Sequence, residues 1–135
     1  MESGRLWRNT VQVRTLGVTA GILGFTGVAA GAFAAHALEG RIDAHHIEIF
    51  QTGARYHLIH ALALLAAAYA AESWSARWGS RAGILFTLGV ILFSGSLYLL
   101  ALTGTGWLGA ITPLGGAALL SGWLSLVAAA RDRGS

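Results

Sequence analysis

The sequence contains no cysteine and no lysine, one proline, and few charged residues of any kind. Without cysteine, the chain has no disulfide, no thiolate metal site and no cysteine nucleophile. Only 11% of its 135 residues are charged, whereas soluble globular domains carry roughly 25%. Because so little charge cannot cover a surface that faces water, and the mean hydropathy is +0.61, the composition favours one membrane-embedded domain.

All nine cations are arginines, and most of them flank apolar runs. A sequence pI near 10.2 would suit a nucleic-acid partner if the arginines formed a basic patch on a soluble surface. Cations at the ends of apolar runs are instead typical of membrane topology signals. We therefore expect the lipid bilayer, and no nucleic acid, as the partner of this surface.

Four apolar runs cover most of the chain, at about residues 16–38, 47–71, 82–102 and 107–130. Each is long enough to cross a hydrocarbon core, because about 20 residues at about 1.5 Å each span about 30 Å. We predict an all-α, polytopic membrane protein with a four-transmembrane-helix bundle. Its single domain covers residues 16–130, between a cytoplasmic segment at 1–15 and a cytoplasmic tail at 131–135.

The first apolar run has one alternative interpretation, a secretory signal peptide. Three arginines precede it, and Ala32-Phe33-Ala34 resembles a small-residue cleavage site. The run is longer than the apolar region of an ordinary signal peptide. We expect it to be retained as the first transmembrane helix.

The arginines also predict an orientation. They lie before the first run, between the second and third, and after the fourth: Arg5, Arg8, Arg14, Arg77, Arg81, Arg131 and Arg133. The connection at residues 103–106 is uncharged, and the one at 39–48 is net acidic. By the positive-inside rule, both termini lie in the cytoplasm (N-in/C-in). We expect a multi-pass protein of the inner (plasma) membrane.

The first run carries five glycines on one side, Gly17, Gly21, Gly24, Gly27 and Gly31. At 100° per residue they fall within an arc of about 120°. Small residues on one face let a second helix approach closely and favour association in the bilayer. Helix packing is the favoured interpretation, and the lining of a narrow pore or cofactor cleft is the alternative.

Polar residues gather at the start of the second run and form the candidate polar cluster: Glu48, Gln51, Thr52, Arg55, Tyr56 and His60. On a helix the first four share one face, and Tyr56 and His60 occupy the neighbouring face. His57 points to the opposite side. Among catalytic patterns, the sequence has no GxSxG, HExxH or P-loop motif, so we expect no enzyme.

Arg55 lies near the outer interface, where a charge costs a few kcal/mol unless it is paired or hydrated. It has two interpretations. In the first, it fixes the preceding loop to the bundle, with loop carbonyls, Glu39, Asp43 or a group of another helix as its partner. In the second, it contacts a ligand or an ion.

His60 lies deeper and needs an internal partner. The possible partners are the hydroxyls of Ser94, Ser96 and Tyr98. The alternatives are a proton relay with Tyr56 and Glu48, or ligation of haem or a metal together with His36. Because no recurring metal-ligand spacing is present, we expect neither a metal nor a cofactor.

Several stretches together resemble one family: residues 31–38 (GAFAAHAL), 50–65 (FQTGARYHLIHALALL), 93–98 (FSGSLY), 112–116 (TPLGG) and 122–123 (GW). They are similar to the small four-helix membrane family catalogued as domain of unknown function 423, with its YgdD-like and transmembrane protein 256-like members. The resemblance implies an integral membrane protein of uncharacterised activity. Ala34 stands where the family often has Gly, and His57 where it often has Gln, which argues against a common role for an imidazole there.

Two functional classes remain open. In the first, the chain is a structural or accessory subunit whose glycine-rich faces bind partner helices in a homo-oligomer or a larger membrane complex. In the second, it is a small proton, anion or solute carrier or channel that uses the candidate polar cluster. Four helices are few for a transporter, so transport would favour a homo-oligomer.

Overall fold

The computed structural model describes residues 2–132, apart from the side chains of residues 2, 5, 6, 8 and 9. Four long helices form nearly all of this part of the chain: α1 (Glu2–Phe33), α2 (Ala44–Ser73), α3 (Ala76–Thr103) and α4 (Thr112–Arg131). A π-helical stretch, Ala34–Leu38, continues α1, and a short 3₁₀ helix, Gly106–Ala110, precedes α4. The predicted all-α, four-helix architecture is confirmed. Arg133 and the side chains of Arg5 and Arg8 lie outside the described part.

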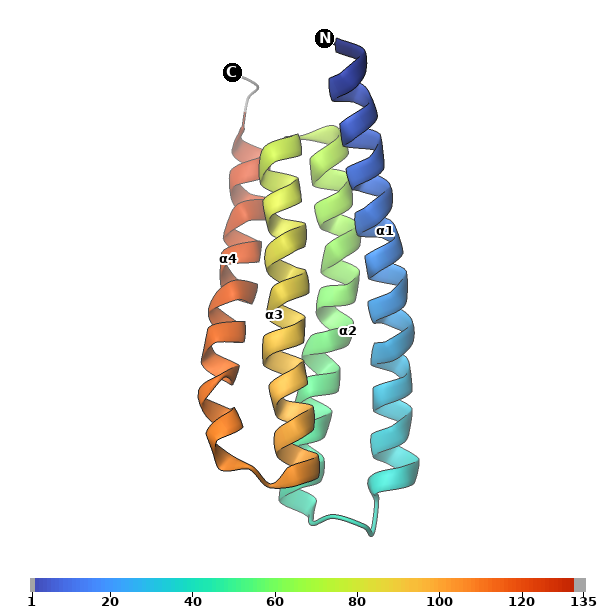
Figure 1. Ribbon diagram of the computed structural model, residues 1–135, viewed down its shortest axis with the longest axis vertical. Helices are drawn as coiled ribbons and strands as arrows, with labels where there is room; N and C mark the ends of the chain where they lie inside the picture. The colour runs from blue at the N-terminus through green and yellow to red at the C-terminus, as the bar shows by residue number, and fades with distance from the viewer. Residues whose placement is uncertain (1, 133–135) are drawn as a thin grey trace.

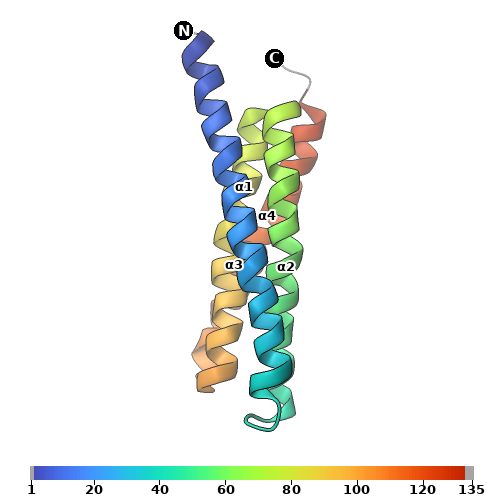
Figure 2. The same ribbon diagram turned by 90° about the vertical axis from the view of Figure 1, so that its right-hand side faces the viewer.

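The four helices lie side by side in chain order, each antiparallel to the next (Figure 1). Helices α2 and α3 are central, and α1 and α4 form the two edges. In the view turned by 90°, α1 lies in front and α4 behind (Figure 2). Among the described residues, no Cα of α1 lies within 8 Å of a Cα of α4. The bundle is therefore open. Helix α1 begins and α4 ends at the same end of it (Figure 1), which we call the terminal end; the opposite end is the loop end.

Three helical segments of the described chain are long and apolar enough to cross a membrane: Thr10–Leu38, Ala76–Thr103 and Gly106–Arg131. Helix α2 is not among them. It is 30 residues long, but Arg55, His57 and His60 lower its hydropathy. Because α1 and α3 flank it on both sides (Figure 1), its two histidines His57 and His60 are buried by protein, and the four helices form one membrane-embedded bundle.

Close helix contacts depend on glycines of α3 and α4. A Cβ added to Gly79 would collide with the backbone of Ala71 on α2, and one added to Gly115 with the backbone of Phe93. Small residues at these positions bring the helix backbones together, which increases van der Waals contact where no hydrophobic effect operates. The main core cluster lies beside them and joins all four helices: Leu16, Ala20, Ala63, Leu64, Ala67, Ala68, Ala82, Phe86, Val90 and Leu119.

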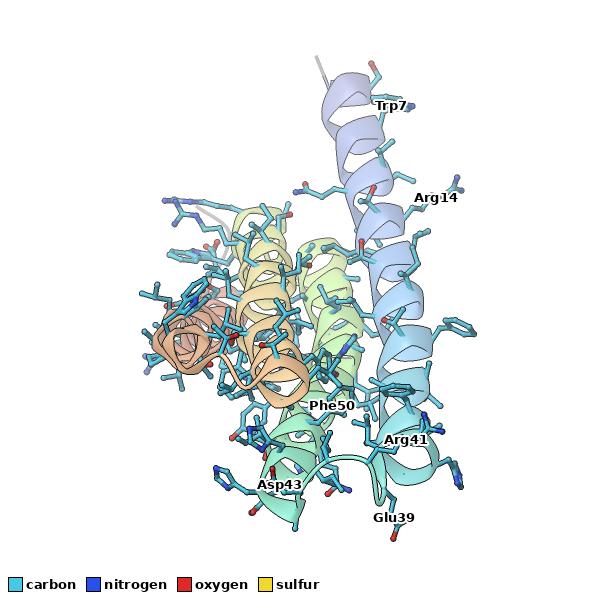
Figure 3. The ribbon with its side chains drawn as sticks, turned by 60° about the horizontal axis from the view of Figure 1, so that its bottom comes forward. Trp7, Arg14, Glu39, Arg41, Asp43 and Phe50 are labelled. Carbon is cyan, nitrogen blue, oxygen red and sulfur yellow. The ribbon has the colours of Figure 1, made fainter. Side chains whose placement is uncertain are left out.

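Helix α2 begins at a capped N-terminus in the loop that follows α1. The Asp43 carboxylate accepts the backbone N–H of His46 at 3.1 Å and bonds its ring Nδ1 at 2.6 Å. These contacts favour the ionised carboxylate, so the backbone N–H of His46, and then its ring, hold the pKa of Asp43 below its usual value. Figure 3 shows Asp43 at the start of α2, and Phe50 farther along that helix.

Candidate functional site

The candidate polar cluster does not converge on the interior of the bundle. Glu48, Gln51, Arg55 and Tyr56 are all exposed. The hydroxyl of Thr52 bonds the carbonyl of Glu48 in its own helix at 2.9 Å. The face of α2 that carries most of these residues is therefore turned outward, and His60 is the one member of the cluster that is buried.

Arg55 has none of the loop partners considered for it. Glu39 points away from the bundle at the loop end (Figure 3), and Asp43 is paired with His46. Within residues 2–132, Arg55 makes no hydrogen bond or ion pair with any described side chain. None of the donors of the guanidinium is used by the described residues.

His60 is held by α2 itself and by α4. Its Nδ1 lies 2.7 Å from the carbonyl oxygen of Tyr56, and Trp123 Nε1 donates to its Nε2 at 3.1 Å. A carbonyl only accepts and an indole N–H only donates, so the two partners fix a neutral imidazole that carries its proton on Nδ1. The imidazole also packs on Phe86, with ring centroids 5.5 Å apart. Both ring nitrogens are thus occupied.

The hydroxyls considered as partners of His60 bond elsewhere. Ser94 Oγ donates to the carbonyl of Gly53 at 2.7 Å. Ser96 Oγ lies 2.7 Å from Thr112 Oγ1 and links α3 to α4. His36 lies exposed in the π-helical stretch. In the described chain, no group of three His, Asp or Glu side chains is placed to hold a metal ion.

The role of His57 was not predicted from the sequence. It is 7% exposed, with Nδ1 2.9 Å from Tyr98 Oη on α3 and Nε2 3.2 Å from Thr26 Oγ1 on α1. Thr26 in turn donates to the carbonyl of Ile22. The chain of bonds is complete if Tyr98 donates to a neutral His57 and His57 donates to Thr26. This single side chain connects three helices.

These contacts give α2 two different faces. On one, His57 and the Gly53 carbonyl bond to α1 and α3; on the other, His60 bonds to α4. Interhelical hydrogen bonds between polar groups hold membrane helices together. The buried polar groups of α2 therefore act as structural connections. The signal that could have identified the inward face was the row of small residues at Gly53, Ala54 and Ala61, which are all buried.

Described residues line a groove on each side of α2. The α2–α4 groove has a volume of about 470 Å³ and is lined by Arg55, Tyr56, Ile59, His60, Phe93, Gly116, Leu119, Leu120 and Trp123. The α1–α2 groove has a volume of about 480 Å³ and an almost entirely apolar lining: Gly17, Ala20, Gly21, Gly24, Val28, Leu58, Ala61, Leu62 and Leu65.

The glycines of α1 are used unequally inside the chain. A Cβ at Gly27 would approach Leu58 to 2.9 Å, so this glycine packs against α2. A Cβ at Gly17, Gly21, Gly24 or Gly31 would meet nothing within 4 Å. Most of the five glycines therefore face open space, and three of them line the α1–α2 groove.

Comparisons with known proteins agree with this architecture. A family model described as protein of unknown function (DUF423) matches residues 30–116. The chain is 46% identical over 104 residues to the UPF0382 membrane protein YwdK of Bacillus subtilis (strain 168), covering 76% of this chain and 85% of that one. It is 42% identical over 115 residues to the UPF0382 inner membrane protein YgdD of Escherichia coli (strain K12), covering 84% and 88%. No solved structure matches it.

The resemblance seen in the sequence is thereby confirmed over most of the chain. The matched region runs from the end of α1 through α2 and α3 into the first turns of α4, so it includes His57, His60 and Arg55. The chain is a membrane protein that belongs to the DUF423 family.

Proposed function

We propose that this chain is a non-enzymatic accessory subunit of the inner (plasma) membrane, and that its α1–α2 groove binds one transmembrane helix of another membrane protein. The observation that carries the proposal is the open space over Gly17, Gly21 and Gly24. Glycine weakens a helix interior unless a close approach uses it. Among the described glycines of α1, α2 makes such an approach only at Gly27.

The position of α1 supports this use. It is an edge helix of an open bundle (Figure 1), and its outer surface is apolar, with Val18, Phe25 and Val28 each more than 60% exposed. The α1–α2 groove has no charged residue in its lining. An apolar helix with small or flat residues fits it, since van der Waals packing on a glycine surface drives helix association in lipid.

The orientation is part of the same proposal. Arg14, Arg77, Arg81 and Arg131 all belong to the terminal end of the bundle. Under the positive-inside rule this end faces the cytoplasm, which gives N-in/C-in. The partner helix then crosses the bilayer beside α1, with its contact region level with residues 17–28.

The carrier or channel alternative has less support. Transport requires polar groups that are free to contact a solute along a path through the bundle. His57 and His60 have both ring nitrogens bonded, and Ser94 and Ser96 bond neighbouring helices. Arg55 has no partner among the described residues, but it faces outward.

The test is a native pull-down of the full chain in mild detergent, comparing Gly21→Leu with Ala29→Leu. Gly21 lies in the groove with space for a side chain, so the variant should fold and insert normally yet lose its co-purifying partner. Ala29 is exposed outside the groove, and its variant should retain the partner. Equal recovery of the partner by both variants would refute the proposal.

Two further readouts separate the alternatives. Copies of the chain with two different tags show whether the co-purifying helix belongs to a second copy, which would replace the proposed accessory role with a homo-oligomer. Arg55→Gln and His60→Ala are the variants for transport. If either abolishes a solute flux while the protein still inserts at normal levels, the carrier interpretation is correct and the accessory one is wrong.

A further inference from the structure

The α2–α4 groove differs from the α1–α2 groove in its chemistry. Helices α2 and α4 pack on opposite sides of α3 and leave between them a depression with Phe93 as part of its lining. Aromatic rings form its walls: Tyr56 lies 4.6 Å from Phe93, and His60 lies 5.9 Å from Trp123, between ring centroids. Ile59, Leu119 and Leu120 complete a surface that is mainly apolar.

One cation belongs to this lining, and no acid does. Arg55 is exposed and unpaired within the described chain. A guanidinium in the membrane is costly unless an anion or water satisfies it. An occupant that complements the groove therefore needs a long apolar part and one negative group beside Arg55.

The depth of Arg55 indicates how such an occupant would lie. Gly53 contacts Leu97 and Tyr98 of the antiparallel helix α3, so Arg55 is about level with Gly95. That is about seven residues, or roughly 10 Å, from Leu102 near the loop end. The long arginine side chain can keep its methylenes on apolar surface and extend its charge toward the headgroups.

The remaining lining runs from Arg55 toward the middle of the bilayer. Trp123 is level with His60, to which it is bonded, and His60 is five residues, or about 8 Å, deeper than Arg55. A molecule with its anion at Arg55 and its apolar part at Trp123 has the orientation of a phospholipid in the leaflet at the loop end. The volume of about 470 Å³ lies within the roughly 300–1,000 Å³ of small-molecule sites.

We propose that the α2–α4 groove is a binding site for one anionic phospholipid, with its phosphate on Arg55 and an acyl chain along Phe93, Leu120 and Trp123. The guanidinium supplies charge-assisted hydrogen bonds to the phosphate oxygens. The net negative headgroup is preferred because a cation near the membrane surface contributes about a fivefold gain in affinity for anionic lipid.

Trp123 provides a reporter inside the proposed site. We would use the full chain with the other tryptophans replaced by phenylalanine: Trp7, Trp74, Trp78 and Trp107. It is reconstituted in vesicles of equal phosphatidylglycerol and phosphatidylcholine, in which one of the two lipids carries brominated acyl chains that quench a tryptophan in contact with them. Brominated phosphatidylglycerol should quench Trp123 more strongly, with a relative affinity of about five over brominated phosphatidylcholine.

Two pairs of variants test the charge of Arg55 and the shape of the α2–α4 groove separately. Arg55→Gln should reduce the lipid preference to about one, while Arg41→Gln, which removes a cation from the loop between α1 and α2, should leave it unchanged. Gly116→Leu should fill the groove and weaken quenching by both lipids. A Cβ at Gly116 lies 3.8 Å from Phe93, an ordinary contact, so the variant is expected to fold. Ala117→Leu, exposed outside the groove, is its control.

Three results would overturn the proposal. The first is equal quenching by the two brominated lipids in the parent chain. The second is a preference that survives Arg55→Gln. The third is a Trp123 that neither lipid quenches, because a protein segment then covers the groove. The result is independent of the α1–α2 groove, so it does not depend on the accessory role.

Discussion

Replacing Trp123 with phenylalanine removes one hydrogen bond and keeps an aromatic ring on α4. The bond from Trp123 Nε1 to His60 Nε2 is 3.1 Å long, and His60 is only 3% exposed. The variant leaves a buried acceptor without a donor, which costs about 1–3 kcal/mol in proteins generally. Interhelical hydrogen bonds in membranes contribute about 0.6 kcal/mol on average and about 1.7 at most. Because His60 is so well buried, we expect a loss of about 1–2 kcal/mol.

Because the chain has no cysteine, this loss of stability can be measured with site-specific dyes on introduced cysteines. Cysteines introduced at Ser73 and Ala130, both exposed at the terminal end, can carry a donor and an acceptor dye on α2 and α4. Energy transfer between them, followed while SDS is titrated into mixed micelles, gives the free energy of separating these helices. Trp107→Phe is the matched control, since Trp107 is 67% exposed and lies in the short 3₁₀ helix before α4.

A double-mutant cycle with His60→Leu isolates the bond itself. In the His60→Leu background, which lacks the acceptor, Trp123→Phe should lower the free energy of helix separation by less than it does in the parent chain. The coupling energy should lie between about 0.6 and 1.7 kcal/mol. If the coupling is zero, or if Trp123→Phe is no more destabilising than Trp107→Phe, then His60 is not held by α4 in the way described. The assignment of a neutral, Nδ1-protonated imidazole, which depends on this hydrogen bond, would then also be wrong.

Two other predictions concern packing and capping. Gly115→Ala should destabilise the bundle by about 1–3 kcal/mol because its Cβ meets the α3 backbone. Gly116→Ala, whose Cβ makes only an ordinary contact with the Phe93 ring, should be neutral or slightly stabilising in the same SDS titration. Since folding lowers the pKa of Asp43, its stabilising contribution should be complete above the ordinary aspartate pKa. It should be lost as the pH falls through the lowered value. Amide exchange at His46 should follow that change, and Asp43→Asn should abolish it.

The sequence was a good guide to where the helices lie along the chain. The apolar runs at 82–102 and 107–130 fall inside α3 and inside the segment Gly106–Arg131, because their hydropathy and length do not depend on neighbours. Helix α1 starts at Glu2, well before the apolar run at residue 16. An apolar run marks only the part of a helix that suits hydrocarbon, and no proline interrupts the preceding residues.

The sequence was a poor guide to which face of α2 points inward. Helical spacing placed Arg55 and His57 on opposite sides, as the structure also has them. Choosing the buried side requires the partner helices, and the sequence alone singles out the group with more polar residues as the candidate polar cluster. Because Thr26 and Tyr98 are distant from His57 in the sequence, no local pattern predicts that they complete its hydrogen bonds.

Hydrogen bonds to neighbouring helices allow a helix of modest hydropathy to lie at the centre of a membrane bundle. Helix α2 carries the two buried histidines, and each bonds to at least one neighbouring helix. In hydrocarbon these groups would be costly without those partners. The stability of α2 in the membrane therefore depends on α1, α3 and α4 being assembled around it, whereas α1, α3 and α4 have enough apolar length to span alone. Substitutions that remove Tyr98 or Trp123 should act on the placement of α2 before they act on any other helix.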